Sequence, residues 1–262
     1  MTRNLRRLAL LLALAPAVLP AAPQAPPSGD PDAAPSSAPD APHARSRAPL
    51  PAFRARYELS HNGEPLGEAE ISLEPGAHGA WTFVTESHGS GGLAGLVGAE
   101  IHERTVFRWR DGLPELIESD YDQQVAWKRK QRHLRVDAER GVVEASDEKR
   151  SSELPYSPNL LDRHVTVLAL AADRARGRTS FEYTVADKHK VEPVVYRDAG
   201  TESVETPAGR YRTERIERVR QKNPGRTTTS WLAPELGYLP VRLLQREPDG
   251  DTMEMRLVRM ER

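Results

Sequence analysis

The chain has no cysteine among its 262 residues. Without cysteine it can form neither disulfide bonds nor a structural zinc site built on thiolates. It also lacks the cysteine that a bacterial lipoprotein carries directly behind its signal segment. We therefore expect the mature protein to be soluble and to have no acyl anchor.

The sequence also lacks a long run of charges of one sign. The 37 basic and 38 acidic residues are interspersed, and the formal net charge is −1. A nucleic-acid-binding surface needs a basic patch or stripe, so nucleic acid is not an expected partner. The one local basic run, residues 128–133, would place Lys128, Lys130 and Arg132 on one face of a strand. That face could meet anionic lipid headgroups, but we favour a solvent-exposed strand that pairs with the acidic segment 115–122.

The motifs of common enzyme classes are absent. There is no His-Glu-x-x-His pair and no Gly-x-Ser-x-Gly elbow, and the glycine-rich segment 89–98 lacks the context of a phosphate-binding loop. His88 and His102 could face each other across a hairpin, yet zinc needs three or four converging ligands. Paired carboxylates are frequent, so a glycan hydrolase stays as a disfavoured alternative. We expect no catalytic residue, no metal and no cofactor, and a protein that is not an enzyme.

The first residues have the pattern of an export signal. Three arginines precede a short apolar run at residues 8–15, and small residues follow it. This pattern predicts a signal peptide over residues 1–22 and a periplasmic protein. The run is too short to span a bilayer, and Pro16 and Pro20 interrupt it, so we disfavour an uncleaved anchor and expect no stable transmembrane span after signal removal.

Residues 23–51 are rich in proline, alanine, serine and aspartate and contain few bulky apolar side chains. Such a segment cannot bury enough apolar surface to offset the entropy of ordering, which predicts a disordered linker. The remaining residues, 52–262, are enough for one domain with a substantial core.

Strand periodicity dominates the chain after residue 52. Apolar and polar residues alternate at period two, and turn signals such as Asn62-Gly63 separate the runs. About a dozen strands exceed what a flat sheet holds comfortably. We predict a mainly β fold: one large curved antiparallel sheet, as a rolled sheet or half-open barrel, with one short helix over residues 162–175. The expected buried face includes Phe53, Tyr57, Ile71, Leu73, Phe107, Trp109, Ile216, Trp231, Leu243 and Leu257.

Four segments resemble a known family. They are Tyr-Glu-Leu with Leu-Gly-Glu-Ala-Glu (57–70), Phe-Glu-Tyr-Thr-Val-Ala-Asp (181–187), Thr-Pro-Ala-Gly-Arg-Tyr-Arg-Thr (206–213) and Trp-Leu-Ala-Pro-Glu-Leu-Gly-Tyr-Leu-Pro-Val-Arg (231–242). Together they are similar to the bacterial envelope family called domain of unknown function 3108, over about residues 51–262. The resemblance implies an exported, β-rich protein and carries over no catalytic residue.

A looser likeness exists to periplasmic lipoprotein carriers of the Lol type. Those proteins are half-open barrels that hold acyl chains in an apolar concavity. The likeness rests on the late strands around residues 231–242, and it concerns the fold, which does not establish a function.

These observations predict a non-enzymatic periplasmic protein that binds a lipid or another amphiphilic envelope component in the concavity of its sheet. An apolar loop within the glycine-rich segment could cover the mouth of the sheet, although a buried connection is the favoured alternative for it. A second possible role is that of a protein-interaction module of an envelope assembly. The candidate ligand-binding residues are Leu93, Leu96, Val97, Trp127 and Trp231.

Overall fold

The structure is a computed structural model that describes residues 48–90, 98–220 and 225–262. The predicted signal peptide and nearly all of the predicted linker lie outside the described residues. In the described part of the chain, no helix is long and apolar enough to cross a membrane.

The fold is one sheet of fifteen strands. The strand order is β8-β7-β6-β5-β4-β3-β2-β1-β15-β14-β13-β12-β11-β10-β9. Consecutive strands pair antiparallel from β1 to β8 and from β10 to β15, and β1 pairs with β15 so that the first and last strands meet at the centre of the sheet. The strands are β1 (Phe53–His61), β2 (Glu64–Pro75), β3 (Ala80–Gly89), β4 (Glu100–Arg110), β5 (Leu113–Val125), β6 (Lys128–Asp137), β7 (Val142–Asp147), β8 (Ser151–Pro155), β9 (Leu161–Asp162), β10 (Ser180–Asp187), β11 (Lys190–Thr206), β12 (Gly209–Val219), β13 (Thr227–Ala233), β14 (Leu239–Arg246) and β15 (Thr252–Glu261).

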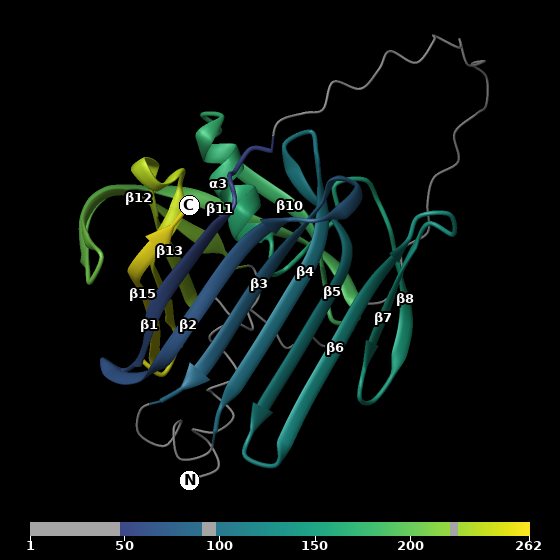
Figure 1. Cartoon of the computed structure of the whole chain (residues 1–262), viewed down its shortest axis with the longest axis horizontal. Coiled ribbons are helices and arrows are strands. Elements are labelled where there is room, and N and C mark those ends of the chain that lie inside the picture. Colours follow the sequence, from purple (N-terminus) through teal and green to yellow (C-terminus); the bar gives the residue numbers. More distant parts are fainter. Residues whose placement is uncertain (1–47, 91–97, 221–224) are drawn as a thin grey trace.

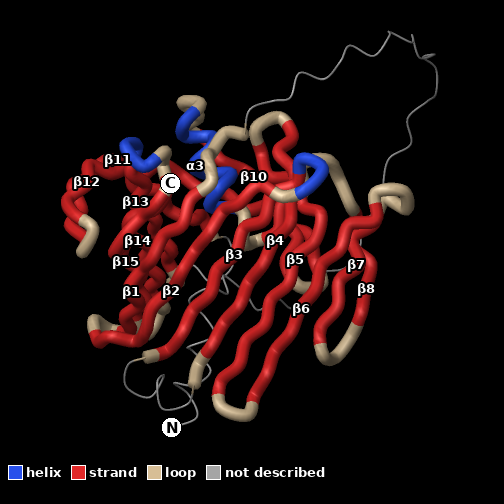
Figure 2. The backbone as a smooth tube through the Cα atoms, in the orientation of Figure 1, coloured by secondary structure: helices blue, strands red, loops and turns tan. Residues whose placement is uncertain are grey.

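The sheet is strongly curved but does not close into a barrel. Its edge strands are β8 and the short β9, which pairs parallel with β10. In Figures 1 and 2, β10 passes behind the wall formed by β2–β6, and β12 and β13 lie to the left of that wall. The prediction of one large, curved, mainly antiparallel sheet is therefore confirmed.

Within residues 48–90, 98–220 and 225–262, the α-helix is α3 (Thr166–Ala175), and two short 3-10 helices, Ala77–Gly79 and Pro234–Leu236, lie in turns. The sequence predicted that the helix begins at Asp162. It begins four residues later because Asp162 belongs to β9 and its Oδ1 accepts a hydrogen bond from the amide of Val165, directly before the helix. The helix lies at the upper end of the sheet, and the turn between β5 and β6 lies at the lower end (Figure 1).

The strand lengths vary widely within the predicted sheet. The longest, β11, has 17 residues and a register shift between Asp198 and Thr201. The edge strands β8 and β9 have only five and two residues. The hairpin at Asn62-Gly63 is confirmed, with positive φ angles of 53° and 82° as a tight turn requires.

Two apolar clusters hold the curved sheet together. The larger one packs α3 against the inner faces of β1–β4 and β10–β15. Seven residues of the predicted buried face belong to it, and the other three, Ile71, Trp109 and Leu243, are partly buried and pack against it. Leu50, which precedes β1, also packs in it. The smaller cluster joins Leu116, Leu134 and Val143 on β5–β7 to Ala186 on β10. Burial of such side chains contributes about 25 cal/mol per Å² of apolar surface, so these clusters provide most of the stabilisation of the curl.

Candidate functional site

Polar side chains project from the inner face of β3, β4, β5 and β6. Strand pairing places Thr85, Glu103, Tyr121 and Arg132 in one row across these strands. Asp162, Arg163 and His164, which connect β9 to α3, lie against them. The inner face is therefore apolar around α3 but polar where β9 crosses the sheet.

His164 joins two of these strands. Its Nε2 lies 2.8 Å from Thr85 Oγ1, and its Nδ1 lies 3.0 Å from Thr105 Oγ1. Thr105 donates its single proton to Asp162 Oδ2 at 2.7 Å. Because that proton is used, Nδ1 must donate to Thr105. In the neutral imidazole the proton therefore lies on Nδ1, and Nε2 accepts from Thr85.

Burial favours the same neutral form. His164 is 8% exposed. Burial lowers the pKa of His164 to about 3; the carboxylate of Asp162 opposes this shift and Arg163 adds to it. A histidine in an unfolded chain has a pKa near 6.5. The folded chain thus excludes a proton that the unfolded chain binds below that pH.

This difference predicts a pH-dependent stability. As pH falls from about 6.5 towards 3, the unfolded state gains a proton that His164 cannot accept, so the free energy of unfolding should decrease by up to about 1.4 kcal/mol per pH unit. Urea unfolding of wild type and His164→Gln between pH 7.5 and 5 tests this. The substitution should lower stability at pH 7.5 and flatten the decrease below pH 6.5. His88→Gln, at an exposed position, should leave the slope as in wild type; an unchanged slope in His164→Gln would contradict the assignment.

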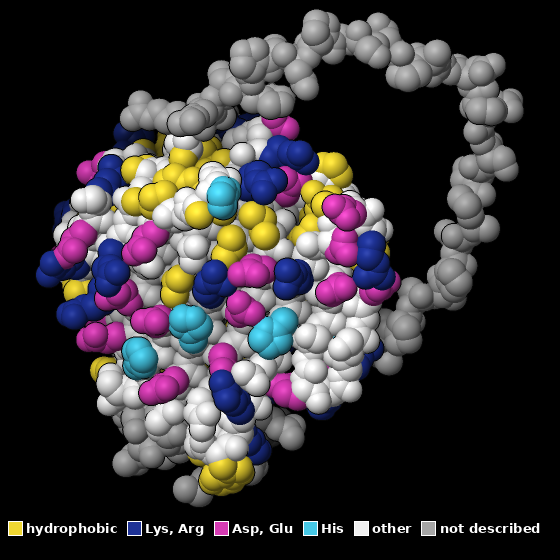
Figure 3. All heavy atoms as spheres, turned by 45° about the vertical axis from the view of Figure 1, so that its right-hand side comes forward, with side chains coloured by type: hydrophobic (Ala, Val, Ile, Leu, Met, Phe, Trp, Pro, Cys, Tyr) yellow, Lys and Arg dark blue, Asp and Glu magenta, His cyan; other side chains and the backbone are white. Residues whose placement is uncertain are grey.

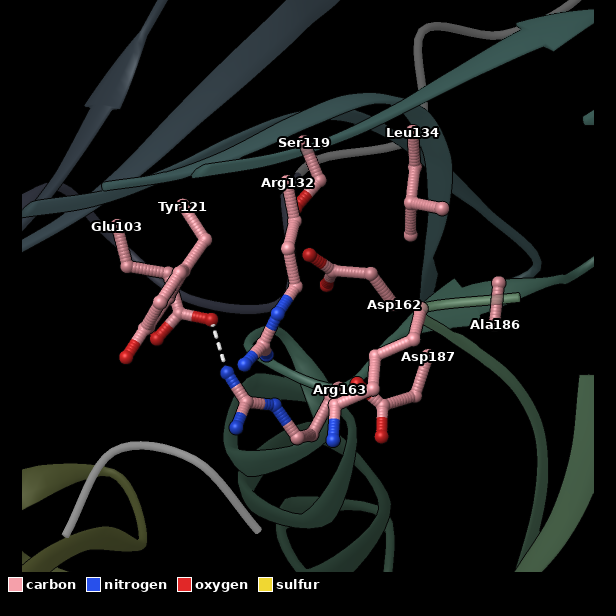
Figure 4. Close-up of a pocket in the computed structure, with 10 residues that line it drawn as sticks. Glu103, Ser119, Tyr121, Arg132, Leu134, Asp162, Arg163, Ala186 and Asp187 are labelled. Atoms are coloured by element: carbon pink, nitrogen blue, oxygen red, sulfur yellow. Dashed lines mark hydrogen bonds and ion pairs between the residues drawn. The ribbon is translucent and has the colours of Figure 1, made fainter. Parts of the chain in front are cut away.

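The second feature is a buried ion pair between Glu103 and Arg163 (Figure 4). Their side chains are 4% and 8% exposed. Burial raises the pKa of Glu103, and Arg163 opposes that shift. Burial also works against the charge on Arg163, but Glu103 and Asp187 outweigh it and raise the pKa of the guanidinium. Arg163 therefore remains a cation inside the protein.

Around this pair lies a small polar cavity. Its lining includes Tyr121 on β5, Arg132 on β6, and Asp187 and Lys188 at the end of β10. The cavity volume is about 30 Å³, which accommodates one or two water molecules. Figure 4 shows the side chains of Glu103, Tyr121, Arg132 and Arg163 pointing toward one another.

Several polar atoms in this region have no hydrogen-bond partner. They are Glu103 Oε2, Tyr121 Oη, Arg163 Nη1 and Asp187 Oδ2, all on side chains that are less than 9% exposed. Buried polar groups are nearly always paired, and leaving one unpaired costs about 1–3 kcal/mol. The cavity therefore has the donors and acceptors to hold a polar group.

A different surface continues from this cavity toward the lower end of the sheet. We call it the lower wall; it consists of Ser87, Ile101, Gln123 and Val125 on β3, β4 and β5. All four are buried. The two apolar members belong to neither apolar cluster. The hydroxyl of Ser87 and both amide atoms of Gln123 have no hydrogen-bond partner.

The outer face of the sheet is different. Cross-strand ion pairs cover it, such as Arg54–Glu70 at 2.9 Å and Arg104–Glu118 at 2.7 Å. In Figure 3, basic, acidic and histidine side chains are intermixed on the visible face. Exposed pairs of this kind contribute about 0–1 kcal/mol each. This face therefore offers no concentrated charge of one sign.

The family comparison covers the whole of this architecture. A family model described as "Protein of unknown function (DUF3108)" matches residues 56–258. The chain belongs to the DUF3108 family. The resemblance read from the sequence is thus confirmed. No curated protein matches the chain.

A solved structure shares the fold at low sequence identity, and two others are more distantly similar. A β-barrel-like protein of the DUF1849 family from Brucella abortus is 12% identical, with a TM-score of 0.51 over 82% of this chain and 99% of that one. An exported protein with a YmcC-like fold from Bacteroides fragilis has a TM-score of 0.33 at 10% identity, over 82% and 98% of the two chains. MucB from Pseudomonas aeruginosa, in its complex with MucA, has a TM-score of 0.31 at 9% identity, over 80% and 51%. The first likeness shows a shared fold, and the other two are too distant to support an argument.

The sequence-predicted binding residues of the DUF3108 domain lie in different places. Leu93, Leu96 and Val97 lie outside the described residues. Trp127 lies in the turn between β5 and β6 and is 87% exposed, and Trp231 is packed in the larger cluster. Trp231 Nε1 donates to Glu202 Oε1 at 2.7 Å, and the guanidinium of Arg242 lies 4.4 Å from its ring centre. The structure does not bring the two tryptophans together, and their role in ligand binding stays a prediction.

Sequence analysis missed the polar cluster and the lower wall. The signal was nevertheless present. On β4, Glu103 and Thr105 occupy the same parity as Ile101 and Phe107, which places them on the buried face. On β5, Tyr121 and Gln123 share their parity with Val125. When a charged or polar residue occupies an inward-facing position of a strand, between apolar residues of the same parity, it indicates a buried polar site rather than a solvated strand face.

The basic run 128–133 divides between the two faces. Arg129 makes hydrogen bonds to Asp122, and His133 Nδ1 lies 2.7 Å from Asp120, both on the outer face of β5. Arg132 points inward and stacks on Tyr121, with its guanidinium carbon 4.6 Å from the ring centre. The acidic partner strand thus neutralises the outward part of the run, whereas Arg132 belongs to the cavity.

Proposed function

We propose that the DUF3108 domain is a non-enzymatic binding protein of the periplasm that holds an amphiphile on the concave side of its sheet. The lower wall is the observation that carries this proposal. Its apolar side chains pack in neither core cluster, and they stand beside buried polar atoms that have no partner. An occupant with an alkyl chain and a polar group would satisfy both kinds of surface.

The polar groups argue for binding rather than for a structural core. In a core that serves only stability, inward polar side chains are usually paired or replaced by apolar ones. Both ends of the Gln123 amide are unpaired although the residue is 2% exposed. A ligand that supplies hydrogen bonds to this amide would recover the cost of its burial.

The histidine network does not favour catalysis. Thr85 is the hydroxyl next to His164 Nε2, and a threonine–histidine pair could in principle form a nucleophile and its base. Thr85 is 1% exposed, and His164 Nδ1 contacts Thr105 rather than a carboxylate. These contacts lock β9 and α3 onto the sheet, which supports a structural role for the network.

Release of a bound amphiphile from the purified protein tests the proposal. We expect native mass spectrometry of the protein from its own host envelope to show a ligand mass, and organic extraction to release an amphiphile. The double variant Ile101→Ser/Val125→Ser should retain at least about tenfold less, because it removes about five buried methyl or methylene groups at about 0.8 kcal/mol each.

The matched control is Val219→Ser, which changes an exposed apolar side chain, 43% accessible, on β12. It should retain as much ligand as wild type. A wild-type protein that carries no amphiphile and binds none when it is offered would contradict the proposal. A specific protein partner in place of a lipid would favour the interaction-module alternative.

A further inference from the structure

The cavity beside the lower wall has cations without ion-pair partners. Arg132 and Lys188 are both half-buried, and neither forms an ion pair with any residue that the structure describes. Arg132 reaches the cavity from β6, and Lys188 reaches it from the turn between β10 and β11. Strand β6 and the turn between β10 and β11, which belong to opposite halves of the sheet, thus each contribute one cation to the same cavity.

The acidic side chains of the cavity are largely engaged elsewhere. Glu103 is paired with Arg163. Asp162 accepts hydrogen bonds from Thr105 and from the amide of Val165. With Asp187, the three carboxylates of the lining balance its three cations in number. Arg132 and Lys188 nevertheless have no ion-pair partner among the described residues, and an anionic group between them would supply one.

Two further donors point into the cavity from behind the cations. Arg163 Nη1 and Tyr121 Oη have no hydrogen-bond partner, and their side chains are more than nine-tenths buried. In Figure 4, the guanidinium of Arg163 faces Glu103 and lies next to that of Arg132, and the side chain of Tyr121 lies beside Glu103. Guanidinium and phenol groups are hydrogen-bond donors that suit the oxygen atoms of a phosphate or carboxylate. The water-sized cavity has room for one such oxygen, while the remainder of the group would lie between Arg132 and Lys188.

This cavity is continuous with the lower wall. Tyr121, Gln123 and Val125 are successive inward residues of β5, and Tyr121 and Val125 are about 13 Å apart at the usual rise of a strand. A headgroup at Arg132 therefore places an alkyl chain alongside Gln123, Ile101 and Val125. The chain would then run toward the turn that contains Trp127.

We infer that Arg132, Lys188, Arg163 and Tyr121 form a subsite for the anionic headgroup of a single-chain or diacyl amphiphile, with the alkyl chain on the lower wall. The inference rests on the proposed function, since it names the class of amphiphile that the concave side binds. The negative charge sits on a phosphate or carboxylate, and neutral or purely cationic headgroups bind less well.

Isothermal titration calorimetry with three probes separates the contribution of the alkyl chain to binding from that of the anionic headgroup. Decyl phosphate has both the chain and the anion, decyl maltoside has the chain with a neutral head, and inorganic phosphate has the anion alone. We expect decyl phosphate to bind at least about tenfold more tightly than decyl maltoside, since one charge-assisted hydrogen bond is worth about 1.5–3 kcal/mol. Inorganic phosphate should bind weakly.

Two variants locate the effect. Arg132→Gln and Lys188→Gln should each reduce the affinity for decyl phosphate by about tenfold and leave that for decyl maltoside unchanged. Arg135→Gln is the matched control, because Arg135 is exposed on the outer face of the same strand. Circular dichroism melts confirm that each variant is folded, and Arg132 has no hydrogen bond in the described structure whose loss would unfold it.

The outcomes distinguish the two proposals. Equal affinity for decyl phosphate and decyl maltoside, or equal affinities in Arg132→Gln and wild type, would overturn the headgroup subsite while the amphiphile proposal stands. Failure of both decyl probes to bind would overturn the proposed function and the subsite together. If inorganic phosphate binds as tightly as decyl phosphate, the site is one for a free anion and the lower wall has no part in it.

Discussion

Replacing Glu103 with leucine is expected to lower the free energy of unfolding by about 3–5 kcal/mol. The substitution leaves the guanidinium of Arg163 buried without its carboxylate, and Arg163 is only 8% exposed. Arg163→Met should destabilise by a similar amount, because it leaves Glu103 unpaired in the same place. Urea unfolding at pH 7 measures both effects.

The double variant Glu103→Leu/Arg163→Met completes the cycle. It replaces both charges with apolar side chains of similar size, so its loss of stability should be much smaller than the sum of the two single losses. Additive losses would show that the two side chains do not act as a pair. Arg110→Met is a suitable comparison for a more exposed arginine, since its side chain is 47% accessible and it pairs with Glu115.

Replacing Gly67 with alanine is the second substitution with a large expected effect, a loss of about 3 kcal/mol. Gly67 lies on β2 opposite Gly89 on β3. A Cβ atom at Gly67 would lie 2.0 Å from the carbonyl oxygen of His88 and 3.0 Å from the Cα of Gly89. Both are backbone atoms, so relief requires the two strands to move apart.

Gly76→Ala provides the matched control. Gly76 follows the end of the same strand, but a Cβ there would meet its nearest atom, the carbonyl oxygen of Ala80, at 3.4 Å. Thermal melts should show Gly76→Ala within about 1 kcal/mol of wild type. A Gly67→Ala protein as stable as wild type would mean that β2 and β3 are not this close.

Much of the fold could be predicted from the sequence, because alternate side chains of a strand point to opposite faces of the sheet and only one face is buried. Phe53 and Tyr57 on β1, or Phe107 on β4, alternate with charged residues, and the structure buries them. The central pairing of β1 with β15 could not be predicted, because it joins segments at opposite ends of the domain and no local signal sets its register. The strand β9 has only two residues and depends on the pairing of Leu161 with Val185 on β10.

The candidate site was less predictable for a physical reason. Charged residues were assigned to the solvated face because isolated charges are rarely buried. Asp162, Arg163 and His164 are consecutive, and they were expected at the start of the predicted helix. All three are buried, since Thr105, Glu103 and Thr85 meet them from neighbouring strands. Partners that compensate for the burial of polar side chains arise only when distant segments come together, so a single sequence does not show them.

The central claim, that the lower wall contacts an amphiphile, is tested most directly by methyl NMR. The chain contains four isoleucines, at positions 71, 101, 117 and 216. Labelling their δ1 methyl groups therefore gives a spectrum of four signals. Ile101 belongs to the lower wall, whereas Ile216 is 1% exposed and packed in the larger cluster.

On titration with decyl phosphate, the account predicts that the Ile101 signal shifts and shows cross-peaks to the alkyl protons of the ligand, while the Ile216 signal stays in place. If Ile101 remains unchanged at saturating ligand, with no cross-peak to the alkyl chain, the amphiphile does not bind on the lower wall and the account is contradicted.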